Sequence, residues 1–164
     1  MPNQEHLYAI KKEVEKFFQK MGFEVDLDVQ AGPETSFNIK IKSEEPQILI
    51  GEGGQTLFEI QRLLKIILKK RLKDNIYIDF DVNDYKKKKL EYLRELARSA
   101  ADEVSLIKKE KALEPMSPYE RRIIHLELAE NPNVSTESAG EEPRRYVIIK
   151  PQSENGVEKQ SISN

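Results

Sequence analysis

The sequence predicts an α+β protein of two small units, residues 1–83 and 84–150, followed by a tail at 151–164. Two observations predict this fold class. Stretches with an apolar residue at every third or fourth position, the period of a helix, alternate with stretches in which every second residue is apolar, the period of a half-buried strand. A length of 164 residues suffices for two such units. The tail is polar, so we expect it to be disordered.

The first unit is predicted to run in the order helix, strand, strand, short helix, glycine turn, helix, strand. A Gly-Pro dipeptide separates the first two strands, because it breaks their alternating pattern. The predicted elements are a helix at 4–20, two strands within 24–42, a helical turn at 44–50, a helix at 55–72 and a strand at 76–82.

The second unit is predicted to begin with a long helix that starts around Asn83-Asp84 and continues to Ile107, because apolar residues step by three and four along it. A turn at 139–143 separates the last two strands. The remaining elements are a strand near 111–115, a helix at 118–129 and strands near 133–138 and 144–150.

Composition excludes several classes of function. The net charge of -2 and the isoelectric point near 5.9 give no global basic signal, so nucleic-acid binding must rest on local patches. The chain has no cysteine, and His6 and His125 lie far apart in the sequence, so we predict no disulfide, no metal site and no cofactor. No apolar stretch approaches the ~20 residues that cross a bilayer. We therefore expect a cytoplasmic protein without a signal peptide or a membrane span.

The helix predicted at 118–129 has a well-defined start and a basic face. The run Ser117–Glu120 is a capping box, in which serine is the N-cap, proline the first helical residue and glutamate the reciprocal partner. Arg121 and His125 are four residues apart, so both side chains project from one face, and Arg122 adds a second cation. We expect this face to bind an anion.

The run Gly51–Gly54, of sequence Gly-Glu-Gly-Gly, lies between two predicted helical segments. Glycine lets the backbone approach other groups closely, and the N-terminus of the next helix offers unpaired N–H groups to a phosphate. An isolated G-x-x-G run is also typical of a plain corner between helices, so both interpretations stand. A Walker phosphate loop is excluded, because no Gly-Lys-Ser/Thr ending follows.

Residues 4–82 resemble a KH domain of the type II topology, a three-stranded sheet with helices on one face, with Ile50-Gly51-x-x-Gly54 as the signature loop. KH domains hold about four nucleotides of single strand against this loop and an adjoining apolar groove. The resemblance implies contacts to the sugar-phosphate backbone by the loop and a groove lined by apolar neighbours. The implied residues are Gly51, Glu52, Gly53 and Gly54 in the loop, and Ile48, Leu57 and Ile39 in the groove.

The loop departs from the usual KH pattern, in which the two variable positions are often basic or polar. Here they are Glu52 and Gly53, and a carboxylate near a phosphate costs about 1 kcal/mol even in near-aqueous surroundings. We expect Lys65 and Lys69 on the next helix to support binding. Lysines at such positions are also typical of an ordinary solvated face.

Residues 84–150 resemble the R-x-x-x-H (R-three-H) domain, with Arg121 and His125 at its two named positions. Members of this family bind single-stranded nucleic acid, which implies a phosphate or base contact by Arg121 and a stacking or hydrogen-bonding role for His125. As an imidazolium, His125 would tighten binding as the pH falls through about 6.5. The alternative is that His125 packs beside Ile124 and Leu128 and only satisfies a backbone carbonyl.

The last predicted strand adds basic and aromatic character to the second unit. Arg144, Arg145 and Tyr146 are its first residues. Strand geometry places Arg144 and Tyr146 on one face and Arg145 on the other. We expect both arginines, together with Arg122, to contact nucleic acid.

A KH domain followed directly by an R-x-x-x-H domain resembles the bacterial Jag family over nearly all of residues 4–150, because two independent motifs occur in the family's order. The resemblance implies a second small KH protein, or a second copy of this chain, as a partner. It also implies a link to cell-envelope growth. Jag proteins commonly carry a further N-terminal domain, whereas this chain begins at the KH helix.

We therefore predict a non-catalytic protein that binds single-stranded RNA, or single-stranded DNA, through the glycine loop and the Arg/His face. A nuclease is the competing class, but no nucleophile is paired with a base and no His/Asp/Glu set recurs at metal-binding spacing. A protein-interaction scaffold that dimerises through its KH unit is the third class.

Overall fold

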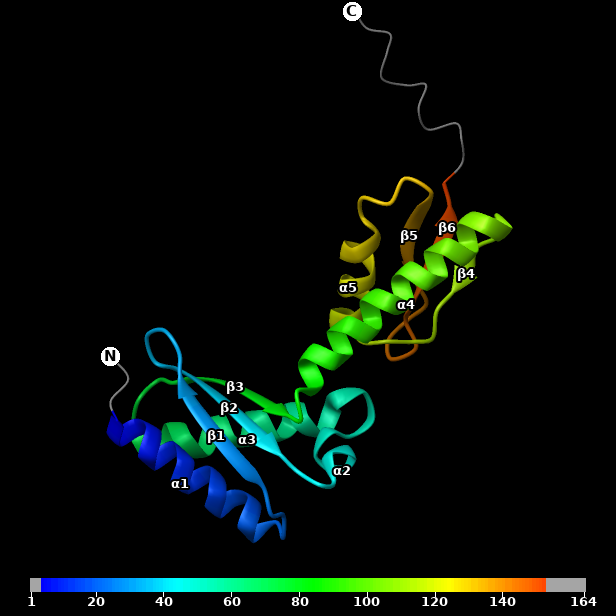
Figure 1. The fold of residues 1–164 in the computed structure, drawn as a ribbon. Helices are drawn as coiled ribbons and strands as arrows, with labels where there is room; N and C mark the ends of the chain where they lie inside the picture. Colours follow the sequence, from blue (N-terminus) through cyan, green and yellow to red (C-terminus); the bar gives the residue numbers. More distant parts are fainter. Residues whose placement is uncertain (1–3, 153–164) are drawn as a thin grey trace, which may run out of the picture. The chain divides into compact units, whose positions relative to one another are not determined.

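The computed structural model describes residues 4–152, and the chain divides after Lys87 into two compact units. Each unit has its own three-stranded sheet (Figure 1). Each also has its own apolar core. From residue 153 onward the predicted tail lies outside the described residues, and Pro151 belongs to the last strand instead. Within the described range, every helix is too short or too polar to cross a membrane.

The first unit has the predicted order of elements, and its α+β class is confirmed. Its strands lie in the order β1-β2-β3, with β1 antiparallel and β3 parallel to the central β2. Helices α1 and α3 cover one face of this sheet (Figure 1). The elements are α1 (Gln4–Lys20), β1 (Asp26–Ala31), β2 (Ser36–Lys42), α2 (Pro46–Ile50), the 3-10 turn η1 (Glu52–Gly54), α3 (Gln55–Leu72) and β3 (Tyr77–Val82).

Alternation along β2 buries one side of the strand and exposes the other. Phe37 and Ile39 are buried, whereas Asn38 and Lys40 are exposed. The helices add stripes of buried residues at helical spacing, namely Ile10, Val14 and Phe18 from α1 and Leu57, Ile60, Leu64 and Leu68 from α3. This core packs α3, and with it the preceding glycine loop, against the sheet.

The second unit has an antiparallel sheet in the order β4-β6-β5. Apolar residues from both helices and from this sheet form its core, among them Leu93, Ala97, Val104, Ile124, Val147 and Ile149. The elements are α4 (Tyr85–Ile107), which begins just before the division between the units, β4 (Lys111–Ala112), α5 (Pro118–Leu128), β5 (Val134–Ala139) and β6 (Tyr146–Pro151).

The start of α4 and the length of β4 differ from the prediction. Helix α4 begins at Tyr85, because Asn83 and Asp84 adopt left-handed φ angles of 51° and 55° and cannot belong to a right-handed helix. The strand expected near 111–115 pairs over Lys111 and Ala112 only.

The prediction that Arg144 and Arg145 lie on the last strand, on opposite faces, is wrong. The first paired residue of β6 is Tyr146, opposite Ala139 of β5. Residues 140–145 form the hairpin loop between them, which starts at Gly140 with a φ of 80°. The chain reverses here in a tight turn, in which the N–H of Arg144 donates to the carbonyl of Glu141 at 2.8 Å, so Arg144 belongs to the turn and not to the strand ladder.

Candidate nucleic-acid interface

The glycine loop between α2 and α3 is built on three left-handed glycines. Gly51, Gly53 and Gly54 have φ angles of 72°, 59° and 89°, which residues with a side chain rarely adopt. Glu52 and Gly53 at the tip are exposed, and a Cβ atom on Gly53 would meet nothing within 4 Å. The loop therefore presents open backbone at the start of an 18-residue helix whose first turn has no side-chain cap. Its N–H groups favour an anion there.

Close packing holds both ends of the loop. A Cβ atom on Gly51 would lie 2.1 Å from Thr56 Oγ1, and one on Gly54 would lie 2.9 Å from Cε1 of Tyr85. Tyr85 is the first residue of α4 and packs against the core of the first unit. The backbone conformation of the loop is thus set by neighbours that leave room for glycine only.

The apolar residues predicted to line a groove beside the loop fall into two groups. Ile48 on α2 is 51% exposed and is open to a ligand. Leu57 is 4% exposed and Ile39 is fully buried, because both face the packing layer between α3 and the sheet. This corrects the prediction that they contact a ligand. Phe58, the next residue on α3, is exposed instead.

Lys65 and Lys69 are exposed on α3, and the structure does not bring them to the glycine loop. At a rise of about 1.5 Å per residue, Lys65 lies roughly 15 Å and Lys69 roughly 21 Å along the helix from Gln55. The ammonium of Lys65 lies 6.0 Å from the centre of the Tyr77 ring. These lysines could contact bound nucleic acid only if its strand ran from the glycine loop along α3.

The start of α5 has the predicted capping box. The N–H of Ser117 donates to Glu120 Oε2 at 2.7 Å, and the N–H of Glu120 donates to Ser117 Oγ at 3.4 Å. Lys89 of α4 also contacts Glu120, with 2.7 Å between Nζ and Oε1. Burial disfavours the charged carboxylate of Glu120, but the hydrogen bonds from Lys89 and Ser117 outweigh it and lower its pKa. Local sequence and one ion pair together fix the helix that carries Arg121 and His125.

Arg121 is bound within the protein. Its side chain is only 9% exposed, its Nη1 donates to the carbonyl oxygen of Met116 at 2.7 Å, and its Nη2 donates to Glu142 Oε1 at 2.7 Å. Glu142 lies in the hairpin loop 140–145, and its side chain is 53% exposed. The carboxylate is thus the part of this ion pair that faces solvent.

His125 is held by two hydroxyl groups of β5. Its Nδ1 lies 2.7 Å from Thr136 Oγ1, and its Nε2 lies 2.8 Å from Ser138 Oγ. Neither partner is the backbone carbonyl that the alternative interpretation required. Burial, and secondarily the nearby charge of Arg121, lower the pKa of His125 below its usual 6.5. The ring is therefore neutral near pH 7, and any tightening on protonation moves to a more acidic pH than expected.

Three further arginines of the second unit are exposed. Arg122 lies on α5, and Arg144 and Arg145 lie in the hairpin loop. Within residues 4–152 their guanidinium groups make no hydrogen bond or ion pair. A phosphate reaches them without displacing a protein group.

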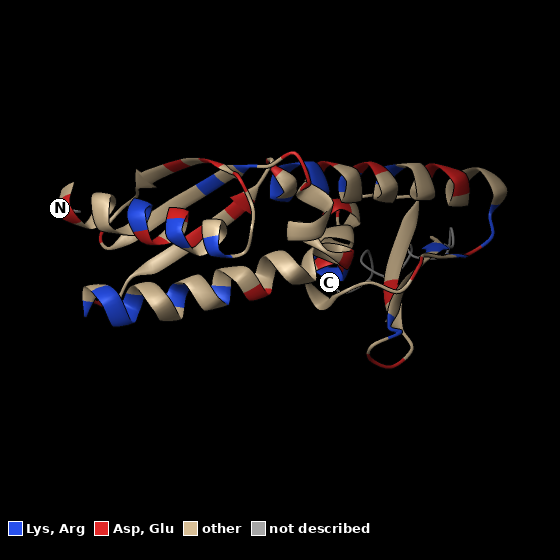
Figure 2. Cartoon of the chain, turned by 90° about the horizontal axis from the view of Figure 1, so that it is seen from below, with Lys and Arg blue, Asp and Glu red and all other residues tan. Residues whose placement is uncertain are grey.

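Charge is otherwise mixed, and Figure 2 shows basic and acidic segments interspersed along the helices and strands.

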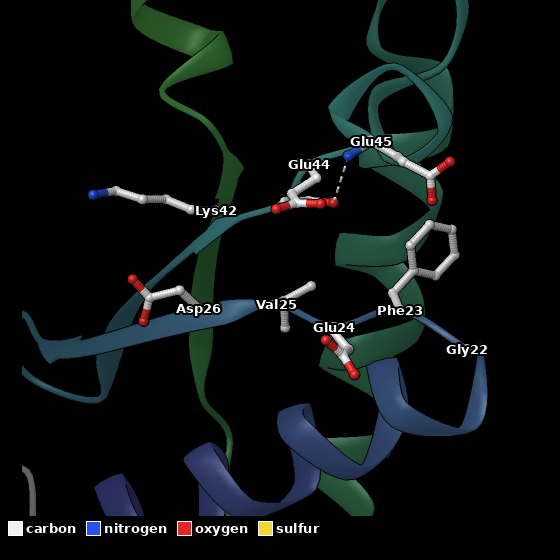
Figure 3. Close-up of a pocket in the computed structure, with 9 residues that line it drawn as sticks. Gly22, Phe23, Glu24, Val25, Asp26, Lys42, Glu44 and Glu45 are labelled. Atoms are coloured by element: carbon white, nitrogen blue, oxygen red, sulfur yellow. Dashed lines mark hydrogen bonds between the residues drawn. The ribbon is translucent and has the colours of Figure 1, made fainter.

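A hollow of about 860 Å³ lies between the α1–β1 turn and the connection from β2 to α2 (Figure 3). Its lining includes the carboxylates of Glu24, Asp26, Glu44 and Glu45, which repel a phosphate. In the part of the chain that the structure describes, no three side chains are grouped to hold a metal ion.

Both units match known domain families. A KH domain model matches residues 6–90, and an R-three-H domain model matches residues 91–151. The chain is thus a KH protein with an R-three-H domain after it. Relatives with the name RNA-binding protein KhpB occur in Clostridium symbiosum (40% identical over 143 residues), Lactiplantibacillus plantarum (32% over 145) and Bacillus subtilis (35% over 126).

These alignments cover 87%, 88% and 76% of this chain and 64%, 42% and 60% of the three relatives. The chain therefore spans less than two thirds of the length of each. With a KH domain over half of its length, an R-three-H domain after it and these relatives, the chain belongs to the Jag, or KhpB, family of KH proteins.

Four residues that hold the site were not predicted from the sequence. Tyr85 packs against Gly54, Thr136 and Ser138 bind His125, and Glu142 binds Arg121. The alternation of Thr136 and Ser138 on a predicted strand is a signal that both face one side. No sequence signal distinguishes Glu142 from its neighbour Glu141 as the partner of Arg121.

Proposed function

We propose that this protein binds single-stranded RNA and does not cleave it. The observation that carries the proposal is the glycine loop, which keeps its tip open at the uncapped start of α3 and whose ends have room for glycine only. Such a loop accepts a phosphate backbone close to its own backbone. The name RNA-binding protein, which the relatives carry, supports the same function.

A second contact is proposed on the R-three-H unit. Arg122, Arg144 and Arg145 are open cations for the phosphates, and Arg121 and His125 lie beside them as the family's two named side chains. Single-stranded DNA offers the same phosphates and bases, so it is a competitor of RNA for this surface.

A protein-interaction scaffold is the second candidate, and one observation favours it. Phe58, Leu63 and Ile66 are exposed apolar residues of α3, and exposed apolar groups of this kind mark contact surfaces when they are contiguous. A small KH protein or a second copy of the chain would be the partner. This partner and a role in cell-envelope growth rest on family resemblance, and a cytoplasmic location rests on the absence of cysteine.

Binding and cleavage are separated by one experiment. Labelled single-stranded RNA of about 20 nucleotides is incubated with the full chain, with divalent metal or with a chelator, and analysed for retention and for length. We expect retention of intact RNA under both conditions. Fragments that form with metal and vanish with chelator would identify a nuclease. A mass above that of the monomer in size-exclusion chromatography, without retention of RNA, would favour the scaffold.

Two variants test the glycine loop. Gly53→Asp adds a charge at an open position that aspartate tolerates, so binding should weaken while the fold persists. Glu52→Lys replaces repulsion by attraction and should tighten binding about two- to fivefold. Glu15→Lys makes the same charge change on α1 and is the control. If Glu52→Lys and Glu15→Lys have equal effects and Gly53→Asp has none, the loop is only a corner.

A further inference from the structure

We propose that Glu142 is an internal substitute for a phosphate, which occupies Arg121 in the free protein and gives way to a phosphate of the bound strand. This inference rests on the proposed function, since it concerns the regulation of the same surface. Glu142 would then set the affinity of the R-three-H unit without contacting the strand itself.

The geometry of the ion pair leaves little of the Arg121 guanidinium open to an external anion. Arg121 has one donor on the Met116 carbonyl and another on Glu142 Oε1, both at 2.7 Å, and its side chain is 9% exposed. Glu142 is 53% exposed, so the carboxylate is the solvent-facing partner of the pair, and its Oε1 already occupies the Nη2 edge of the guanidinium. A phosphate therefore reaches this edge of Arg121 only by replacing the carboxylate.

The charge balance requires an exchange of anions. A guanidinium this deeply buried is costly without a charged acceptor, so Glu142 cannot simply leave. Phosphate and carboxylate oxygens both match the planar fork of arginine, and one can replace the other with little change in geometry. The bond from Nη1 to Met116 needs no change in this exchange.

The hairpin loop permits the exchange without unfolding. Its backbone is fixed by hydrogen bonds, from the N–H of Arg144 to the carbonyl of Glu141 at 2.8 Å within the turn and from the N–H of Met116 to the carbonyl of Arg145 at 3.1 Å. The side chain of Glu142 alone can rotate into solvent. The exposed cations of Arg144 and Arg145 lie two and three residues further along the same loop, where they attract a phosphate to this place.

The test compares two isosteric changes in neighbouring residues. Glu142→Gln keeps a hydrogen-bond acceptor for Arg121 but removes the charge that competes with a phosphate. Glu141→Gln removes the same charge from a carboxylate that makes no hydrogen bond or ion pair among the described residues. We expect Glu142→Gln to tighten RNA binding about three- to tenfold, Glu141→Gln to change it less than about twofold, and the gain to vanish in an Arg121→Ala background. Equal effects of the two changes on RNA affinity, or weaker RNA binding by Glu142→Gln, would overturn the proposal, because Glu142 would then only hold Arg121 in position.

A second readout does not depend on RNA. Inorganic phosphate is titrated into ¹⁵N-labelled protein while the Nε–Hε resonance of Arg121 is followed by NMR, with circular dichroism as a control of folding. Glu142→Gln should respond at a lower phosphate concentration than Glu141→Gln. This response without RNA binding by any variant would support the exchange and refute the proposed function. The absence of any difference between the variants in both assays refutes the exchange, even when the wild type binds RNA.

Discussion

Arg121 and His125 are each held by two groups from other parts of the second unit. Met116 and Glu142 hold the arginine, and two hydroxyls of β5 hold the imidazole. Their conformations are therefore set before any ligand arrives, which lowers the entropic cost of a contact. The same bonds give Arg121 a structural role beside its proposed role in binding.

Arg121→Ala should lower the free energy of unfolding by about 1–3 kcal/mol, because the Met116 carbonyl loses its donor and Glu142 loses its ion-pair partner. The matched control is Arg122→Ala, which removes an exposed arginine from the adjacent position and should change stability by less than about 0.5 kcal/mol. Urea denaturation followed by circular dichroism measures both. Equal losses for the two variants would show that the bonds of Arg121 add nothing to stability.

His125 should make the fold sensitive to mild acid. Its pKa is lower in the folded protein than the unfolded value of about 6.5, so its contribution to stability is present above that pH and is lost as the pH falls through the folded pKa. Between pH 7 and 5 the unfolding free energy of the wild type should fall more than that of His125→Gln. Glu120 and Glu137 also have lowered pKa values, but their contributions to the free energy of unfolding are lost only as the pH falls below about their usual pKa of 4.5. An NMR titration midpoint of His125 above 6.5 would contradict the argument.

At the scale of elements, α5 and the glycine loop are fixed in different ways. The start of α5 follows from a capping box that acts within four residues, and Lys89 reinforces it from another helix. The loop depends on backbone conformation and on packing against Thr56 and Tyr85. Its two consecutive glycines, Gly53 and Gly54, therefore differ in how much they tolerate.

Gly54→Ala should destabilise the first unit more than Gly53→Ala. Both changes place an alanine at a positive φ, which costs about 1–2 kcal/mol. Only at Gly54 would the new Cβ lie 2.9 Å from the Tyr85 ring, so packing strain of about 1 kcal/mol or more adds to the backbone cost. Thermal unfolding of both variants is the measurement. A loss at Gly53 as large as that at Gly54 would mean that the Tyr85 contact yields without cost.

At the scale of the whole molecule, binding must work with a slightly acidic chain. The net charge is -2, and basic and acidic segments are interspersed (Figure 2). Long-range attraction of an RNA strand is therefore weak, and binding depends on local contacts at the loop and at the exposed arginines.

The salt dependence of RNA binding should accordingly be modest. Each phosphate neutralised on a single strand contributes about 0.7 to the slope of log K against log salt, so two to four contacts predict a slope between about -1.5 and -3. Fluorescence anisotropy of labelled RNA across a series of KCl concentrations measures it for the full chain. A slope beyond about -5 would require more phosphate contacts than the loop and the exposed arginines supply.

Several features follow from the sequence alone because their causes are local or periodic. The 3.6-residue and two-residue periods predicted α1, α3 and the first sheet, since burial of one face imposes these periods. The capping box at Ser117 followed from residues three positions apart. The glycine loop was recognisable from its Gly-Glu-Gly-Gly run between two predicted helical segments, since glycine leaves room for other groups close to the backbone.

The tertiary structure alone decided which side chains meet. Glu142 is 21 residues from Arg121 and reaches it only because the β5–β6 hairpin returns to the start of α5. Leu57 is buried while Phe58 is exposed, because packing sets the rotation of α3 against the sheet. The spacing of residues within one helix or strand determines which side chains point the same way. The distance between side chains on different elements depends on how those elements pack. The charge on Arg121 was therefore predictable from the sequence, and the carboxylate that pairs with it was not.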